Sequence, residues 1–238
     1  MTVVTFQIDG KFVSAREGDT VLQAARSADI DIPTLCHLEG LTDVGSCRLC
    51  LVEVGEGEPM TPACVTKVAE GLYVQTDTER LRLHRLTVLE LIFAAGNHIC
   101  AVCVANGHRE LQDAAAAVGM DHVGFEYENK PLSVDLSHEL FGIDHNRCIL
   151  CTRCVRVCDE IEGAHTWGVS GRGTDSRVAT DLDQPWGDSP TCTSCGKCVM
   201  ACPTCALFHR GDTVSGIDHH RERLASLIAA REHKPWPV

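Results

Sequence analysis

The chain has 238 residues and a formal net charge of −12, and hydrophobic residues make up 44% of it. This length allows one large domain or two to three small ones, and the acidic balance argues against nucleic-acid binding, which favours a basic surface. The N-terminus has no basic start followed by an apolar run, and the most apolar stretch, residues 86–96, is short and carries Glu90. We therefore expect neither a signal peptide nor a transmembrane helix, and we interpret the chain as a soluble, cytoplasmic protein.

The 15 cysteines are clustered rather than spread, in blocks at residues 36–64, 100–103 and 148–205. Secreted disulfide scaffolds are short and carry a signal sequence, whereas clustered cysteines in a reducing compartment indicate metal or redox chemistry. The blocks predict an α+β chain of three modules followed by a C-terminal helix and tail. The predicted ranges are 1–78 for an N-terminal domain, 79–138 for a helical His/Cys module, 139–212 for a ferredoxin-like domain and 213–238 for the tail.

The first module begins with two alternating apolar runs on either side of Asp9-Gly10, which is a strong hairpin signal. Thr20 then stands in the N-cap position of a helix whose apolar residues recur at helical spacing. A cysteine-bearing loop and a strand-like run at 51–54 follow. Hairpin, helix, metal loop and strand together predict a small β-grasp domain.

Four cysteines of this module are spaced C-x10-C-x2-C-x13-C, and they are Cys36, Cys47, Cys50 and Cys64. The plant-type 2Fe–2S pattern is C-x4-C-x2-C…C, so the order agrees although the first gap is longer. Gly45 lies just before the close pair, where the backbone must approach the inorganic core. We predict a 2Fe–2S cluster held by these four cysteines, with a zinc site as the alternative.

The second module is predicted to contain a helix over about 79–95 and a shorter one over about 109–118. Between them, Cys100 and Cys103 form a single C-x2-C pair, which cannot complete a cluster by itself. The nearest further candidate ligands are His98 and His108. Two histidines that flank such a pair, in a chain rich in cysteine clusters, are stronger candidates than a lone histidine.

The third module carries the strongest signal, because the run C-x2-C-x2-C-x3-C occurs in it twice. Three cysteines two residues apart wrap three corners of a cubane, whereas the fourth cannot reach the same cube and ligates the other one. We therefore predict two 4Fe–4S clusters, one held by Cys148, Cys151, Cys154 and Cys202 and one by Cys192, Cys195, Cys198 and Cys158. Zinc, which uses pairs of C-x2-C, fits such triplets poorly. Cys205 is left over, and we expect it to pack as a small apolar residue.

Motifs for nucleotide binding are absent from the sequence. It has no G-x-G-x-x-G after a strand, no G-x-x-x-x-G-K-[ST] and no nucleophile elbow. We therefore expect no NAD, flavin or ATP in this chain and no substrate site of its own. The cysteine pattern instead predicts a relay subunit of a larger redox enzyme.

Six stretches carry a family resemblance: IPTLCHLEG, SCRLCLVEV, PACVT, FAAGNHIC, GIDHNRCILCTRCVRVCDE and CTSCGKCVMACPT. In order and flanking sequence they resemble the HoxU-type diaphorase electron-transfer subunits of bidirectional NAD-reducing nickel–iron hydrogenases. They are also similar to the N-terminal part of the large iron–sulfur subunit of respiratory complex I. The resemblance covers nearly the whole chain. It implies a non-catalytic subunit of a hydrogen:NAD oxidoreductase that passes electrons between a flavin-bearing, NAD-binding diaphorase subunit and the small subunit of a nickel–iron hydrogenase.

The resemblance also implies a 4Fe–4S cluster in the helical module, held by one histidine and three cysteines. His98, Cys100 and Cys103 match that pattern, but Arg109 holds the position of the third cysteine. An arginine cannot ligate iron, because its guanidinium stays protonated and offers no lone pair. We expect that a third 4Fe–4S or variant cluster still forms, with His108 as the fourth ligand and with a higher potential than in its relatives. An empty or zinc-bound site is the alternative.

Other functions stay open at this point. The same relay could serve an NAD-linked formate dehydrogenase or a complex I-like NADH dehydrogenase. An iron–sulfur enzyme with its own substrate would need a cluster iron left open, whereas all eight ferredoxin-type cysteines are present. A zinc-stabilised scaffold would be colourless, so the visible absorbance of the purified protein separates it from the others.

Overall fold

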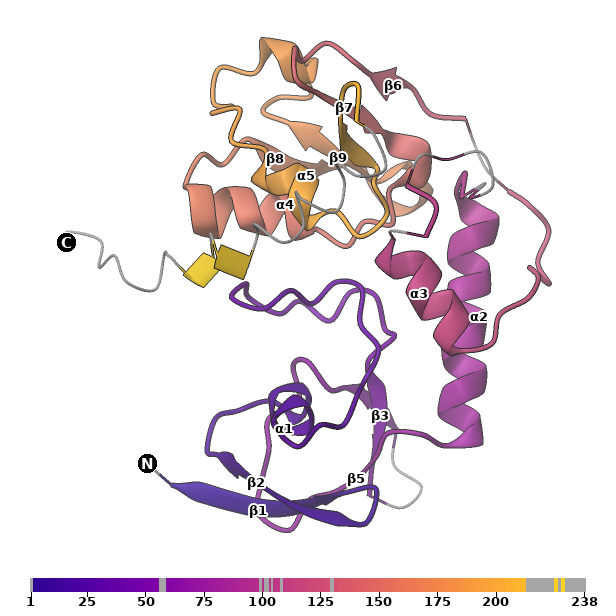
Figure 1. Cartoon of the computed structure of the whole chain (residues 1–238), viewed down its shortest axis with the longest axis vertical. Helices are drawn as coiled ribbons and strands as arrows, with labels where there is room; N and C mark the ends of the chain where they lie inside the picture. The colour runs from indigo at the N-terminus through magenta and orange to yellow at the C-terminus, as the bar shows by residue number, and fades with distance from the viewer. Residues whose placement is uncertain are drawn as a thin grey trace. The chain divides into compact units, whose positions relative to one another are not determined.

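The computed structural model of the chain describes residues 2–55, 59–98, 100, 103, 105–107, 109–128, 131–212, 225–226 and 228–229. The chain divides into two compact units (Figure 1). The first contains residues 1–37, 43–91 and 114–122, and the second contains residues 38–42, 92–113 and 123–238. The helical module expected between the two ferredoxin domains is thus divided between the units, and its boundaries stay a prediction. Among the described helices, none is long and apolar enough to cross a membrane.

The first unit is built on a five-stranded sheet with the order β2-β1-β5-β3-β4. Its strands are β1 (Val3–Ile8), β2 (Lys11–Arg16), β3 (Leu51–Val54), β4 (Met60–Pro62) and β5 (Tyr73–Gln75). β1 and β2 form the predicted antiparallel hairpin, and its turn residues Asp9 and Gly10 have φ of 49° and 77°. Two successive left-handed residues are what a type I′ turn requires. β1 also pairs with β5 in parallel, so segments from both ends of the domain meet inside the sheet.

Helix α1 (Val21–Ser27) packs on this sheet, with Leu22 in one hydrophobic cluster with Phe6 of β1 (Figure 1). A capping box fixes the start of the helix, as the sequence predicted. The backbone N–H of Gln23 donates to the Thr20 hydroxyl at 3.2 Å, and the Gln23 side chain accepts from the Thr20 N–H at 2.8 Å. The mixture of helix and strand confirms the α+β fold class and the N-terminal β-grasp arrangement.

Helix α2 (Glu79–Ala95) follows β5 and confirms the first helix predicted after residue 78. Leu81 and Leu89 are fully buried on its inner face. Arg85, midway between them and one turn from each, is only 6% exposed. The inner face of this helix therefore combines apolar side chains with a buried arginine.

Arg85 joins the helix to the loops of the cysteine-bearing segment. Its guanidinium donates to the carbonyl oxygens of Leu49 at 3.2 Å, Leu51 at 3.1 Å and Thr76 at 2.8 Å. Burial lowers the pKa of Arg85, but a guanidinium keeps its proton in proteins and must be compensated by acceptors. Three carbonyl groups supply that compensation, and in turn each carbonyl gains a donor.

The second unit combines a small sheet, a hairpin and several short helices. The sheet has the order β10-β7-β6, and β8 and β9 form a separate antiparallel pair. The strands are β6 (Val134–Asp135), β7 (Phe141–Asp144), β8 (Trp167–Ser170), β9 (Arg177–Thr180) and β10 (Leu207–His209). The helical segments are α3 (Glu110–Ala117), η2 (His145–Arg147), α4 (Arg153–Arg156), η3 (Val157–Glu162), η4 (Gly173–Asp175), η5 (Trp186–Asp188) and α5 (Lys197–Ala201). The first residues of α3 belong to this unit and its last residues to the other.

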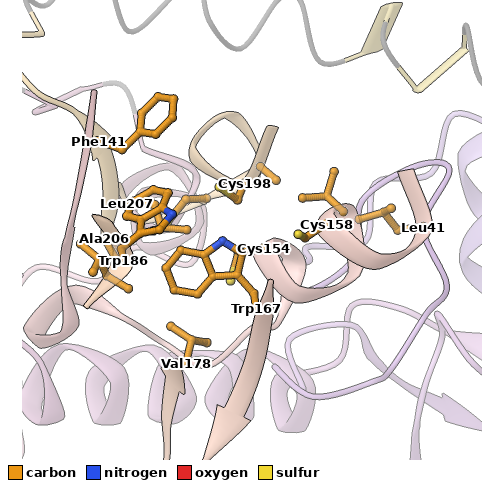
Figure 2. Packing of buried hydrophobic residues seen from close by; sticks show 14 of the residues in the cluster. Leu41, Phe141, Cys154, Cys158, Trp167, Val178, Trp186, Cys198, Ala206 and Leu207 are labelled. Carbon is orange, nitrogen blue, oxygen red and sulfur yellow. The ribbon is translucent and has the colours of Figure 1, made fainter. Parts of the chain in front are cut away.

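An aromatic cluster forms the core of the second unit (Figure 2). The rings of Trp167 and Trp186 lie 4.9 Å apart, and those of Phe141 and Trp186 lie 5.3 Å apart. Most of the predicted C-terminal helix lies outside the described residues. Of the described part, Ile228 is buried in this same cluster.

We expect Arg85→Met to destabilise the first unit by about 2–4 kcal/mol, because it leaves buried carbonyls without a donor while keeping an apolar stem. The midpoint of urea unfolding of the full chain, followed by the loss of visible absorbance, measures the effect. Arg82→Met is the matched control, since Arg82 is an exposed arginine on the same helix that pairs with Asp77. Exposed pairs contribute little, so equal midpoints for the two variants would contradict this role of Arg85.

Candidate metal centres

The four cysteines of the predicted 2Fe–2S site lie together in the first unit. Cys36, Cys50 and Cys64 are fully buried and Cys47 is half-buried. The Sγ atoms of Cys50 and Cys64 lie 3.5 Å apart, and Cys36 hydrogen-bonds to both Cys47 and Cys64. The backbone N–H of Leu35 donates to Cys47 Sγ at 3.4 Å. Four sulfur atoms thus converge at one site.

These residues fit a 2Fe–2S cluster. Hydrogen bonds with Cys36 and Cys50, together with burial, raise the pKa of Cys64 above its ordinary range. Four thiolates therefore need added positive charge to coexist here, and bound iron would supply it. Gly45 and Arg48, on either side of Cys47, have φ of 61° and 59°. These left-handed residues bend the loop that carries Cys47, and the close approach of Gly45 to an inorganic core stays a prediction.

The eight cysteines of the ferredoxin-like domain line two separate cavities. One cavity is lined by Cys148, Cys151, Cys154 and Cys202. The other is lined by Cys158, Cys192, Cys195 and Cys198. Each cavity thus receives three cysteines from one run and the fourth from the other. Figure 2 shows Cys154, Cys158 and Cys198 among the residues of the aromatic core. The crossed assignment of iron ligands stays a prediction, and this geometry supports it.

The two cysteine runs share one backbone pattern. Leu150 and Ser194, just before the second cysteine of each run, have φ of 52° and 56°. Thr152 and Gly196, just after it, have φ of 57° and 71°. Left-handed conformations of non-glycine residues are uncommon, and each costs on the order of 1 kcal/mol or more. Their recurrence at equivalent positions indicates that both loops are shaped to wrap the same kind of group.

A short helical segment leads to the fourth cysteine of each run. Cys158 lies in η3, a π-helical segment that directly continues α4, and Cys202 directly follows α5. Single π turns inside helices are frequent at functional sites, because the wider turn redirects a side chain. Each helical segment therefore connects a cysteine of one cavity to a cysteine of the other.

Burial controls the protonation of these thiols. It raises the pKa of Cys148 to about 11 and, together with the charge of Cys202, that of Cys151 to about 12. The thiols of Cys148 and Cys151 are protonated near neutral pH, so iron has to displace these protons when it binds. The loading of this cavity is therefore favoured as the pH rises.

Two tryptophans give the second cavity hydrogen-bond donors that the sequence reasoning missed. The indole N–H of Trp186 lies 3.3 Å from Cys192 Sγ, and Trp167 makes a side-chain hydrogen bond to Cys198. Hydrogen bonds to cluster sulfur are one of the means by which a protein sets a reduction potential. No cysteine spacing could have revealed them, because they depend on the packing of the aromatic core.

The ligands expected for the middle cluster lie in the second unit. His98 is 7% exposed, and no described residue makes a hydrogen bond to either of its ring nitrogens. Burial, with the nearby charges of Arg109 and Arg147, lowers the pKa of His98 to about 4, so the imidazole is neutral at pH 7. The Cys100 thiol donates to the His98 carbonyl oxygen at 3.1 Å. His108, the expected fourth ligand, lies outside the described residues.

Arg109 changes the chemistry of this middle site. Its side chain is 1% exposed, and its Nη2 group donates to Cys103 Sγ. The described residues therefore offer three side chains that can ligate iron, those of His98, Cys100 and Cys103. A guanidinium, which cannot ligate iron, stands in place of the third cysteine. That set does not fit a cubane with four protein ligands, in contrast to the other three sites.

Three family models match the chain in the expected order. A model of a 2Fe–2S iron–sulfur cluster binding domain matches residues 1–79. A model of the NADH-ubiquinone oxidoreductase-G iron–sulfur binding region matches residues 85–124, and one of the ferredoxin-like domain of NADH-quinone oxidoreductase subunit 3 matches residues 139–208. These matches confirm the predicted 2Fe–2S and 4Fe–4S binding domains.

Whole-chain relatives agree with the family models. Subunit HndD of the NADP-reducing hydrogenase of Solidesulfovibrio fructosivorans is 37% identical over 213 residues, which are 87% of this chain and 36% of that subunit. The alpha subunit of the NADPH-Fe(3+) oxidoreductase of Geobacter sulfurreducens is 38% identical over 211 residues, which are 87% of this chain and 24% of that subunit. In the crystal structure of an NAD+-reducing [NiFe]-hydrogenase in the H2-reduced state, one chain matches with a TM-score of 0.82 and 35% identity over 88% of both chains.

The chain belongs to the family of iron–sulfur electron-transfer subunits of NAD(P)-linked hydrogenases and complex I-like enzymes. This confirms the resemblance read from the six sequence stretches. The electron-transfer subunit spans only 36% and 24% of the length of the two curated relatives, so the activity of those larger proteins does not transfer to it directly.

In this electron-transfer subunit, Cys202→Ala should remove or alter the cluster of Cys148, Cys151 and Cys154 and leave the other cubane in place. The reason is that Cys202 lines the cavity of the first run although it belongs to the second. Electron paramagnetic resonance of the reduced full chain distinguishes the two cubanes. Cys205→Ala, three residues further on, is the matched control and should leave both signals unchanged. Damage confined to the cubane of Cys192, Cys195 and Cys198 would argue against the crossing.

Trp186→Phe should lower the potential of the cluster expected at Cys192. The substitution keeps the aromatic ring but removes the N–H that favours the more negative, reduced state. A hydrogen bond worth about 1 kcal/mol to the reduced state corresponds to about 40 mV for one electron. A redox titration of the full chain measures the shift, and the other cubane is its internal reference. An unchanged potential would show that this hydrogen bond does not tune the site.

Proposed function

We propose that this subunit relays electrons between a flavin-bearing, NAD(H)-binding diaphorase subunit and the small subunit of a nickel–iron hydrogenase. The match to a chain of an NAD+-reducing [NiFe]-hydrogenase, at 35% identity over 88% of both chains, carries this proposal. The substrates would react on the partner subunits of a hydrogen:NAD oxidoreductase, and this subunit would have no catalytic site. The complex would work in the cytoplasm, where clustered thiols are kept reduced.

The proposed cofactors follow from the ligand sets that the fold brings together. They are a 2Fe–2S cluster at Cys36, Cys47, Cys50 and Cys64, a 4Fe–4S cluster at Cys148, Cys151, Cys154 and Cys202, and a 4Fe–4S cluster at Cys158, Cys192, Cys195 and Cys198. When bound, these clusters would supply one-electron carriers. The protein contributes buried sulfur ligands, the exclusion of water and N–H donors that set potentials. We propose no NAD or flavin in this chain.

A second candidate keeps the relay but changes the enzyme. The 38% identical subunit of an NADPH-Fe(3+) oxidoreductase favours a complex without a hydrogenase. A complex I-like NADH dehydrogenase or an NAD-linked formate dehydrogenase would use the same cluster sites. The subunits that copurify with this chain separate these cases, because only a hydrogenase partner brings nickel.

We expect the isolated full chain to show no NADH-to-dye activity, since it lacks a dinucleotide-binding motif. In a complex reconstituted with the flavin subunit and the hydrogenase subunits, the chain should be required for hydrogen-dependent NAD+ reduction. Without it, the flavin subunit should still oxidise NADH with a dye, and the hydrogenase subunits should still oxidise hydrogen with a dye.

Two results would contradict the proposed relay. One is a tightly bound flavin or NADH-to-dye activity in the isolated chain. The other is coupled hydrogen-to-NAD+ turnover at full rate in a complex that lacks this subunit. If formate rather than hydrogen drives NAD+ reduction in the natural complex, the relay stands and the nickel–iron partner is replaced.

A further inference from the structure

The guanidinium of Arg109 lies in the interior of the second unit, with 1% of the residue exposed. A guanidinium stays protonated, so a buried one needs acceptors or negative partners around it. Arg109 Nη2 donates to Cys103 Sγ. The Nη1 group of Arg147 donates to the same sulfur at 3.1 Å, and the backbone N–H of Ala105 does so at 3.4 Å. Three donors, two of them cationic, therefore converge on one sulfur atom.

Two ion pairs lie next to this group of donors. Glu110, the residue after Arg109, makes two hydrogen bonds of 2.8 and 2.7 Å to Arg153, which is itself buried in the ferredoxin-like domain. This bidentate pair fixes the start of α3 and with it the direction of the Arg109 side chain. Arg147 is held by the carboxylate of Asp144, at 3.1 Å from its Nε. The contacts to Cys103 are thus part of a wider network.

This arrangement conflicts with a cluster at the same place. An iron bound by Cys103 would have to displace the two guanidinium groups that now surround its sulfur atom. The position that the family fills with a third cysteine holds a side chain that cannot ligate. The thiol of Cys100, the other cysteine of the pair, donates a hydrogen bond to the carbonyl oxygen of His98.

We propose that the middle module of this subunit carries no iron–sulfur cluster, and that Arg109, together with Arg147, occupies the cluster's place by binding Cys103. This replaces the expectation from the sequence that a third cubane forms with His108 as its fourth ligand. It leaves the other three ligand sets unchanged, so the chain holds one 2Fe–2S and two 4Fe–4S clusters. The inference does not depend on which enzyme the subunit serves.

Iron and acid-labile sulfide analysis of the full chain, produced and purified without air, tests this proposal. We expect about 10 irons per chain from one 2Fe–2S and two 4Fe–4S clusters. Arg109→Cys restores the third cysteine and removes the guanidinium, so it should raise the count to about 14 and add a 4Fe–4S signal in electron paramagnetic resonance. Arg109→Ala is the matched control, because it removes the guanidinium without adding a ligand and should stay at about 10 irons.

A wild-type count near 14, or between the two figures, would overturn the proposal even if no variant folds. In that case His108→Ala and Cys205→Ala would identify the ligand that replaces the lost cysteine, because only the variant that lacks that ligand would lose the extra irons. A folded Arg109→Cys variant that gains no iron would also overturn it, since the guanidinium would then not be what excludes the cluster. None of these results bears on the coupled hydrogen-to-NAD+ assay.

Discussion

A sulfur atom that is buried away from water needs positive charge or hydrogen-bond donors around it, and this chain buries or half-buries every cysteine except Cys195. Burial alone raises the pKa of such thiols, as at Cys148 and Cys151, and so opposes the thiolate form that binds metal. In each of the three complete sites, four sulfur atoms lie together, and bound iron would supply the positive charge that they need. The middle site meets this need with the guanidiniums of Arg109 and Arg147.

The backbone of the ferredoxin-like domain is shaped by the need to wrap its cysteines around two compact groups. Loops that wrap a compact group need left-handed residues, and both runs accept that cost at positions such as Leu150 and Thr152. A short helical segment then carries the last cysteine to the opposite cavity, at Cys158 and Cys202. The two cavities are therefore not independent sites, because a change in either helical segment alters the ligands of both.

Much of this architecture could be predicted from the sequence, because its signals are local. The Asp9-Gly10 turn, the Thr20 cap and the two cysteine runs each depend on spacing within a few residues, which a sequence displays directly. Arg85 was missed, since its carbonyl partners include Leu49, which lies between two cysteines of the 2Fe–2S site and far from α2 in the sequence. The hydrogen bond from the Trp186 indole to Cys192 was not predicted either, because it depends on how the aromatic core packs. Arg109 was recognised as a departure, but its burial against Cys103 only became visible in the fold.

A cluster is a cross-link as well as an electron carrier, and the middle site separates these two roles. The network from Arg109 to Cys103 and from Glu110 to Arg153 still ties α3 to the ferredoxin-like domain, so the module can keep its fold without iron.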